Sequence, residues 1–167
     1  MSGRVLVAGV GNIFLGDDGF GVEVARRLAD EELPADVHVA DFGIRGVHLA
    51  YELLDGYDTA ILVDATPRGG PPGTVYVIEP EPPAARDAGD PAAAPLMDAH
   101  AMAPDAVLGL LDVLGGSCVR VLVVGCEPAE VTERIGLSEP VERAVGDAVL
   151  MVHELLALRE DREGGTR

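Results

Sequence analysis

The sequence predicts a single-domain, three-layer α/β/α fold with a mostly parallel, twisted central sheet of about five strands. Short apolar runs rich in β-branched residues alternate along the chain with stretches of helical periodicity, an order typical of parallel sheets covered by helices. The length of 167 residues suits one domain, and a 48% share of hydrophobic residues can fill its core. We assign residues 1–158 to this α/β domain and residues 159–167 to a charged C-terminal tail.

The first strand is expected over residues 4–10, a nearly continuous β-branched run of the kind buried on both faces of a sheet. A glycine-containing turn ends it, and apolar residues with helical spacing then predict a helix over residues 19–29. Asp17 and Asp18 stand directly before this helix, where a carboxylate suits the N-terminus as a cap and as a partner of the helix dipole.

The same alternation continues through the rest of the chain. Further strands are expected over residues 37–40, 59–63, 74–78 and 119–125, and further helices over residues 47–54, 101–114 and 139–158. Residues 79–95 are rich in proline, alanine and acidic residues and are expected to form a long surface loop.

Charge and composition exclude several classes of function. With 12 Lys+Arg against 29 Asp+Glu, the formal net charge of −17 argues against nucleic acid and anionic membranes as partners. All the basic residues are arginine, which excludes a Schiff-base or Walker lysine. No apolar run approaches the ~20 residues of a membrane span, and the N-terminus lacks the layout of a signal peptide. We therefore expect a cytoplasmic protein.

Polar residues follow the predicted strands, at the sheet edge where α/β proteins bind their ligands. They are Asn12, Asp17 and Asp18 after the first strand, Asp41, Asp64 and Glu127 after later strands, and His100 before the helix predicted over residues 101–114. Each has a structural alternative, because an aspartate can cap a helix or form a turn and a histidine can lie on the surface. Together, Asp18, Asp64 and His100 form a set of oxygen and nitrogen donors suited to a borderline divalent metal.

A nucleotide site is a weaker interpretation of the first turn. The dinucleotide-binding fingerprint would require a third glycine at position 14, which is Phe14. A tight turn between strand and helix explains Gly9 and Gly11 better, which counts against a nucleotide-dependent oxidoreductase.

The same turn carries a resemblance to a known family. Residues 9–21, GVGNIFLGDDGFG, resemble the N-terminal signature of the hydrogenase maturation proteases, endopeptidases that remove a C-terminal extension from the large subunit of nickel–iron hydrogenases. The resemblance spans residues 4 to 157 and continues, in order, at residues 41–46 (DFGIRG), 63–65 (VDA), His100, 125–128 (GCEP) and 135–138 (IGLS). It implies a fold of the phosphorylase/hydrolase-like kind.

The resemblance also implies roles for particular residues. The metal-contacting acids and histidine of the family fall on Asp18, Asp64 and His100, and Asp18 and Asp64 would also be catalytic, one of them as the base. Asn12 and Asp41 would support these groups or orient the substrate. The segment Asp-Phe-Gly at residues 41–43 departs from the more usual Asp-Gly-Gly, which leaves the identity of the substrate hydrogenase open.

Nickel, in this family, arrives with the substrate, so the resemblance implies no permanently bound ion and no organic cofactor. The implied partner is the precursor of a hydrogenase large subunit. The nickel could polarise the scissile carbonyl, or a carboxylate could act as general base while the metal only fixes the register. One alternative function is a non-catalytic, nickel-dependent checkpoint or chaperone that docks on the precursor. A second is a peptidyl-tRNA hydrolase, but that enzyme would need a catalytic histidine soon after the opening turn and a basic surface, and this sequence has neither.

Overall fold

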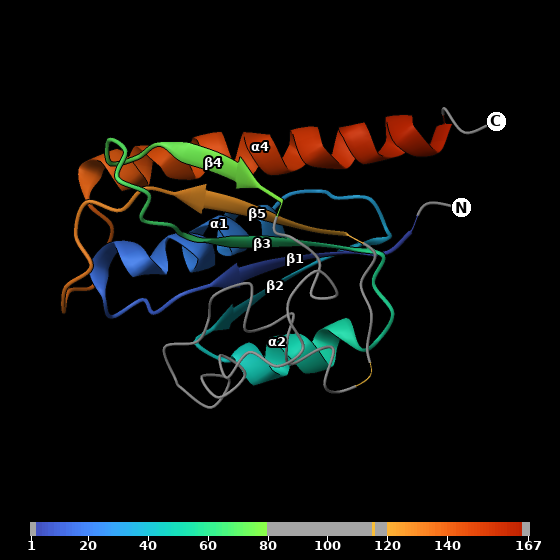
Figure 1. Ribbon diagram of the computed structural model, residues 1–167, viewed down its shortest axis with the longest axis horizontal. Helices are drawn as coiled ribbons and strands as arrows, with labels where there is room; N and C mark the ends of the chain where they lie inside the picture. The colour runs from blue at the N-terminus through green and yellow to red at the C-terminus, as the bar shows by residue number, and fades with distance from the viewer. Residues whose placement is uncertain (1–2, 80–114, 116–119, 165–167) are drawn as a thin grey trace, which may run out of the picture.

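A five-stranded sheet with helices on both faces forms the centre of the computed structural model, which describes residues 3–79, 115 and 120–164 (Figure 1). The strands are β1 (Val5–Val10), β2 (Val37–Gly43), β3 (Thr59–Ala65), β4 (Val75–Ile78) and β5 (Arg120–Cys126). Their order in the sheet is β2-β1-β3-β5-β4, and every neighbouring pair is parallel except β4 and β5. The predicted fold class is therefore confirmed.

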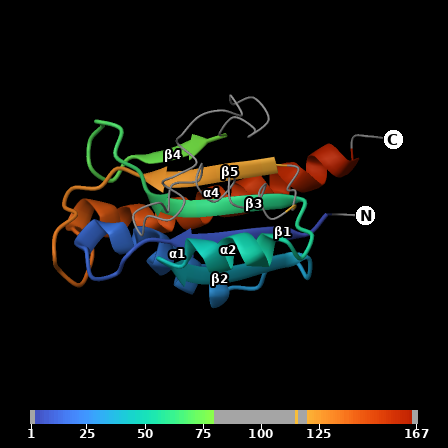
Figure 2. The ribbon, with the colours of Figure 1, turned by 60° about the horizontal axis from the view of Figure 1, so that its bottom comes forward.

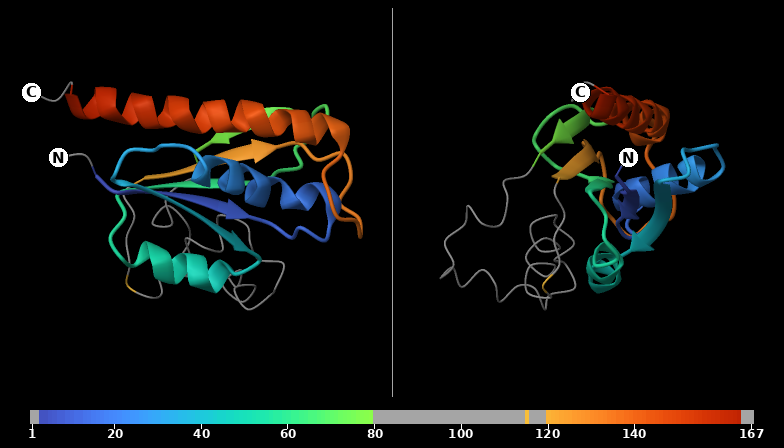
Figure 3. Two further views of the ribbon diagram at one scale, coloured as in Figure 1. Left: turned by 180° about the vertical axis from the view of Figure 1, so that it is seen from behind. Right: turned by 90° about the vertical axis from the view of Figure 1, so that its right-hand side faces the viewer.

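The helices cover the sheet from opposite sides. A short 3-10 helix, η1 (Gly16–Gly19), leads into α1 (Phe20–Ala29), and the later helices are α2 (Gly46–Leu53) and α4 (Glu139–Gly164). Helices α1 and α4 pack against one face of the sheet, and α2 lies against the other (Figures 2 and 3). The helix predicted over residues 101–114 and most of the loop predicted over residues 79–95 lie outside the described residues.

Each face of the sheet has its own apolar core, because successive side chains of a strand point to opposite faces. Along β1, Val5 and Val7 join the cluster formed with α1 and α4, whereas Leu6 and Ala8 join the cluster formed with α2. All six residues of β1 are buried. The continuous apolar run in the sequence is thus explained by a central strand with a core on each side.

The last helix is longer than its sequence pattern predicts. It was expected to end at Leu158 but continues to Gly164. Arg159, placed by the sequence in the charged tail, has its Nη2 3.3 Å from Oδ2 of Asp36 and donates from Nη1 to the carbonyl oxygen of Gly3 at 3.3 Å. These contacts hold the extra turn against the body of the domain. No helix within the described residues has the length and hydropathy needed to cross a bilayer.

Candidate active site

The strand order reverses between β1 and β3, because the chain leaves β1 toward β2 on one side and adds β3 on the other. Ligands of open α/β sheets bind at the carboxyl ends of the strands at such a point. Asp18 lies in η1, shortly after β1 ends, and Asp64 is the penultimate residue of β3. The sheet therefore brings to its reversal point two of the three residues predicted to contact metal.

Gly11 lies close to the main chain of Asp18 and to the side chain of Asp64. Asp18 Oδ2 accepts a hydrogen bond from the Asn12 N–H at 2.8 Å, and Asp64 Oδ1 accepts one from the Ala65 N–H at 2.8 Å. Gly11 has a positive φ of 131°, and a Cβ there would lie 1.8 Å from the Asp18 carbonyl oxygen and 3.7 Å from Asp64 Oδ1. Only glycine fits this conformation and this spacing, so Gly11 lets the two acidic residues approach.

The environment of Asp64 favours its protonated form. Burial raises the pKa of Asp64 well above its ordinary value, and the nearby charge of Asp18 raises it further, while the Ala65 N–H lowers it. A carboxyl group with a raised pKa is better matched to proton transfer near neutral pH than an ordinary surface aspartate. This pair can therefore hold a proton, accept one from water, or bind a cation that neutralises its charge.

Of the remaining predicted site residues, Asn12 contacts Asp18, Asp41 lies opposite Gly9 in the β1–β2 ladder, and His100 is outside the described residues. The Asn12 side chain accepts a hydrogen bond from the Phe14 N–H at 2.9 Å and so shapes the turn, while its main chain binds Asp18. Asp41 is exposed near the end of β2, and its carbonyl oxygen accepts a hydrogen bond from Arg45 at 3.2 Å. Within the described ranges, no three His, Cys, Asp or Glu side chains form a metal-binding group.

Helix α1 holds the opening turn close to the sheet. A Cβ on Gly21 would lie 2.0 Å from the carbonyl oxygen of Val63 and 2.4 Å from that of Val10. The absence of a side chain at this position lets the start of α1 lie directly against β1 and β3. Because Val63 immediately precedes Asp64, this contact fixes α1 and the carboxyl end of β3 relative to each other.

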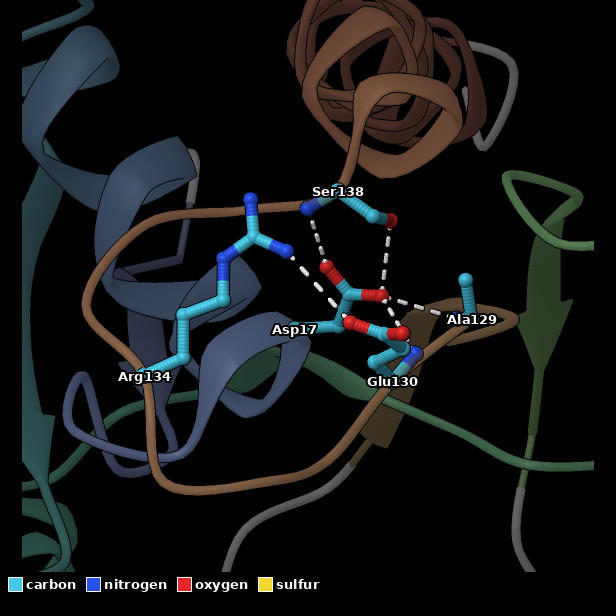
Figure 4. Close-up of polar contacts among 5 residues, drawn as sticks. All are labelled: Asp17, Ala129, Glu130, Arg134 and Ser138. Atoms are coloured by element: carbon cyan, nitrogen blue, oxygen red, sulfur yellow. Dashed lines mark hydrogen bonds and ion pairs between the residues drawn. The ribbon is translucent and has the colours of Figure 1, made fainter.

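Asp17 has a different role from the helix cap predicted for it. Neither η1 nor α1 has a side-chain cap hydrogen bond. Instead the fully buried Asp17 carboxylate accepts hydrogen bonds from the segment after β5, as Figure 4 shows. The donors are the N–H groups of Ala129 (2.8 Å), Glu130 (2.9 Å) and Ser138 (2.7 Å) and the Ser138 hydroxyl (2.8 Å).

These hydrogen bonds make Asp17 a stable anion. Burial alone would raise the pKa of Asp17, but the bonds from Glu130, Ser138 and Ala129 outweigh it, and the pKa lies below the ordinary value. The main chain adds a bond from the Asp17 N–H to the Glu130 carbonyl oxygen at 2.9 Å. Asp17 thus latches residues 129–138 to the turn that carries Asp18, a role the local sequence pattern missed because its partners lie far along the chain.

Glu127, like Asp17, has a structural role. It was predicted to converge with Asp18 and Asp64, but its side chain instead binds the segment between β3 and β4. Its buried side chain accepts hydrogen bonds from the N–H groups of Arg68 (3.0 Å) and Gly70 (2.6 Å) and from the Tyr76 hydroxyl (3.2 Å). Desolvation acts to raise the pKa of Glu127, but these bonds hold it below its ordinary value. Glu127 therefore fixes the connection between β3 and β4.

Comparison with known proteins identifies the family. Residues 22–155 match the family described as hydrogenase maturation proteases. The chain belongs to this family. A hydrogenase expression/formation protein of Rhodobacter capsulatus is 32% identical over 154 residues, covering 87% of this chain and 70% of that protein.

Solved structures of hydrogenase maturation proteases share the whole fold. The hydrogenase 2 maturation peptidase of Thaumarchaeota archaeon SCGC_AB-539-E09 has a TM-score of 0.70 and 34% identity, over 93% of this chain and 99% of that one. The maturating endopeptidase HybD of Escherichia coli has a TM-score of 0.69 and 30% identity, over 95% of this chain and 93% of that one. The present protein is accordingly a peptidase. This favours a catalytic function over a non-catalytic checkpoint, and it argues against a peptidyl-tRNA hydrolase and a nucleotide-dependent oxidoreductase.

Proposed function

We propose that this protease removes the C-terminal extension of a nickel-loaded hydrogenase large-subunit precursor, and that Asp18, Asp64 and His100 recognise the nickel that the precursor carries. The observation that supports this most directly is the pairing of Asp18 with Asp64 at the reversal point of the sheet, where the charge of one raises the pKa of the other. A divalent cation brought by the substrate relieves that repulsion. An empty precursor offers no such gain.

The donor types suit a transient contact with nickel. Two carboxylates and one imidazole are harder ligands than thiolates, which bind nickel more tightly. The protease can therefore touch a nickel ion held by cysteines of the precursor without removing it. The ion remains part of the substrate throughout.

Hydrolysis requires one group to take a proton from water as the oxygen attacks the scissile carbonyl carbon. We assign this role to Asp64, because its burial raises its pKa toward the working range of a general base. The proton then passes to the leaving amine as the carbon–nitrogen bond breaks. In this scheme the nickel fixes the register of the peptide, and the rate comes mainly from positioning.

The test is an intact-mass measurement of a large-subunit precursor incubated with the protease, with and without nickel loading. We expect a discrete C-terminal peptide to be lost only from the loaded precursor. Asp64→Asn should abolish the loss, whereas Asp147→Asn, a matched change at an exposed position of α4, should leave it intact. Binding of the loaded precursor without any loss of mass would overturn the proposal and favour the checkpoint.

A further inference from the structure

Arg68 stands at the carboxyl edge of the sheet, in the connection between β3 and β4 and shortly after Asp64. Its side chain is exposed, and its guanidinium carbon lies 5.8 Å from the centroid of the Tyr76 ring. Arg26, by contrast, is paired with Glu23 at 3.3 Å. In the part of the chain that the structure describes, no acidic side chain forms an ion pair with Arg68.

Arg68 and Asp64 are presented on the same face of the sheet. Along β3, Leu62 belongs to the apolar cluster on the α2 side, and side chains alternate, so Asp64 also points to the α2 side. Along β4, Val75 packs against the opposite cluster, so Tyr76 points to the α2 side as well. The Arg68 guanidinium lies beside the ring of Tyr76, and therefore at the face that carries Asp64.

The strand pairing gives the separation between these groups. Strands β3, β5 and β4 lie side by side (Figure 1), with Asp64 paired with Gly125 and Gly125 paired with Tyr76. Neighbouring strands are ~4.8 Å apart, so the main chains at Asp64 and Tyr76 are roughly 10 Å apart. Gly125 has no side chain, and the Thr66 side chain occupies the space that a Cβ there would need. An extended peptide of about three residues covers this distance, so a polypeptide cut at Asp64 can reach Arg68.

The main chain of Arg68 is held in place by the buried carboxylate of Glu127. The Arg68 N–H donates to both carboxylate oxygens at 3.0 Å, and the Gly70 N–H donates to Oε1 at 2.6 Å. The Tyr76 hydroxyl donates to the same Oε1 at 3.2 Å, so Glu127 also fixes the ring beside which the guanidinium lies. Among the described residues, the guanidinium itself donates no hydrogen bond. Glu127 therefore positions Arg68 without using its guanidinium donors.

An exposed guanidinium selects carboxylates among the groups of a polypeptide. Its planar fork of N–H donors matches the two oxygens of a carboxylate, and such bidentate pairs are among the strong hydrogen bonds of proteins. A net charge of −17 repels acidic groups from much of the surface, so Arg68 offers them a local point of attraction. Asp18 and Asp64 form a negative centre beside it. A substrate that carries both a nickel ion and a carboxylate is thus oriented in one direction.

We infer that Arg68 binds a carboxylate of the precursor, about three residues from the scissile bond. This rests on the proposed function, since it takes the nickel-loaded precursor as the substrate. Arg68 is a specificity residue that sets the affinity and the direction of the bound peptide, while Asp18 and Asp64 act on the bond itself. The carboxylate belongs to an acidic side chain or to the C-terminus of the extension, and the experiment distinguishes these two sources.

The test compares Arg68→Gln with Arg143→Gln, a matched loss of one exposed charge from α4, which covers the opposite face of the sheet. We expect Arg68→Gln to raise the KM and the Kd for the nickel-loaded precursor about tenfold, the scale of one hydrogen bond to a charged group, with kcat unchanged. Arg143→Gln should match the wild type. Arg68→Lys keeps the charge but loses the fork, so its Kd should lie between those of the wild type and Arg68→Gln. Urea unfolding checks that each variant is folded.

Precursor variants identify the carboxylate. Each aspartate or glutamate near the cleavage site is changed to its amide, one at a time, and a separate precursor has its C-terminal carboxylate amidated. Removing the carboxylate that Arg68 binds should raise the Kd of the wild-type protease about tenfold and leave the Kd of Arg68→Gln unchanged. An effect of one side-chain amide assigns the contact to that residue, and an effect of the amidated terminus assigns it to the C-terminus.

Unchanged KM and Kd in Arg68→Gln, or an equal rise in Arg143→Gln, would overturn the inference. So would a set of precursor variants that all bind as tightly as the original precursor. If the wild type binds the loaded precursor but does not cut it, the proposed function fails, and the Kd values still decide the role of Arg68. If the wild type cuts the precursor and Arg68→Gln does so with the same KM, the proposed function stands and only the role of Arg68 is refuted.

Discussion

Replacing Asp17 by asparagine tests the latch between the opening turn and the segment before α4. Oδ2 of Asp17 accepts three hydrogen bonds, from Ala129, Glu130 and the Ser138 hydroxyl, and Oδ1 accepts one from the Ser138 N–H. An asparagine oxygen at the Oδ2 position keeps three bonds but loses the charge that strengthens them. Its amide NH2 group then faces the Ser138 N–H, so two donors oppose each other and that hydrogen bond is lost.

The expected loss of stability follows from these four bonds. A hydrogen bond to a charged group contributes about 1 kcal/mol more than a neutral one, and an unpaired buried donor costs about another 1 kcal/mol. Because the neutral amide is easier to bury than the carboxylate, we expect a net loss of about 3 kcal/mol for Asp17→Asn. With a urea m-value of about 2 kcal/mol/M, the unfolding midpoint falls by roughly 1.5 M.

The pH dependence provides a second check on the same variant. The pKa of Asp17 in the folded protein lies below its ordinary value of 3.8, so the carboxylate stabilises the fold above that pH and loses its contribution as the pH falls through the folded pKa. The difference between wild type and Asp17→Asn should be full at pH 7 and shrink below pH 3.8. A loss under about 1 kcal/mol, or one that persists undiminished in acid, would refute the reasoning.

Three further predictions concern other buried groups. Because the pKa of Asp64 is raised on folding, its ionisation destabilises the fold as the pH rises. Asp64→Asn should therefore raise the free energy of unfolding in urea at pH 7 by about 1 kcal/mol while abolishing peptidase activity. A lower free energy of unfolding would contradict this. Gly21→Ala should lower the free energy of unfolding by about 3 kcal/mol or more, since its Cβ would meet a carbonyl oxygen at 2.0 Å. Its control is Gly146→Ala in α4, where the nearest neighbour of the Cβ lies at 3.9 Å and the free energy of unfolding should rise by up to about 1 kcal/mol. Burial, and to a smaller extent nearby acids, raise the pKa of the Cys126 thiol to about 12. In a Cys118→Ala background, a thiol reagent should therefore modify the protein at pH 8 only after unfolding. Rapid labelling of the folded form would show that the thiol is accessible.

The strands were predictable because their signal is local. Strand β1 needs apolar side chains on both faces, so its six buried residues appear in the sequence as one uninterrupted run. The position of Asp64 at the carboxyl end of β3 was predictable for a related reason. A charged residue at the end of an apolar strand stands out from its neighbours, and the fold class places that end at the binding edge.

The roles of Asp17 and Glu127 could not be predicted, because their partners lie far along the chain. The donors to Asp17 are 112 to 121 residues away, and those to Glu127 are 51 to 59 residues away. Locally, Asp17 looks like a helix cap and Glu127 looks like an acid at a strand end. Only the folded chain shows that each carboxylate accepts hydrogen bonds from main-chain N–H groups and from one hydroxyl.

The length of the last helix was underestimated for the same reason. The sequence after Leu158 is dense in charge, which locally resembles a solvated tail. In the structure, Arg159 packs against Asp36 and Gly3, at the opposite end of the sequence. Contacts that are remote in sequence thus hold Arg159, the first residue beyond the predicted end of the helix, against the domain.

The Asp17 latch also has a consequence for the order of events during synthesis. A ribosome makes the opening turn first, but Ser138, which supplies two of the four hydrogen bonds, is added 121 residues later. At about 5–20 residues per second, the turn waits on the order of ten seconds for its partner. The Asp17 carboxylate thus lacks these donors on the nascent chain until residue 138 has been added, and the turn that carries Asp18 takes its final form only after β5 and the segment that follows it have been made.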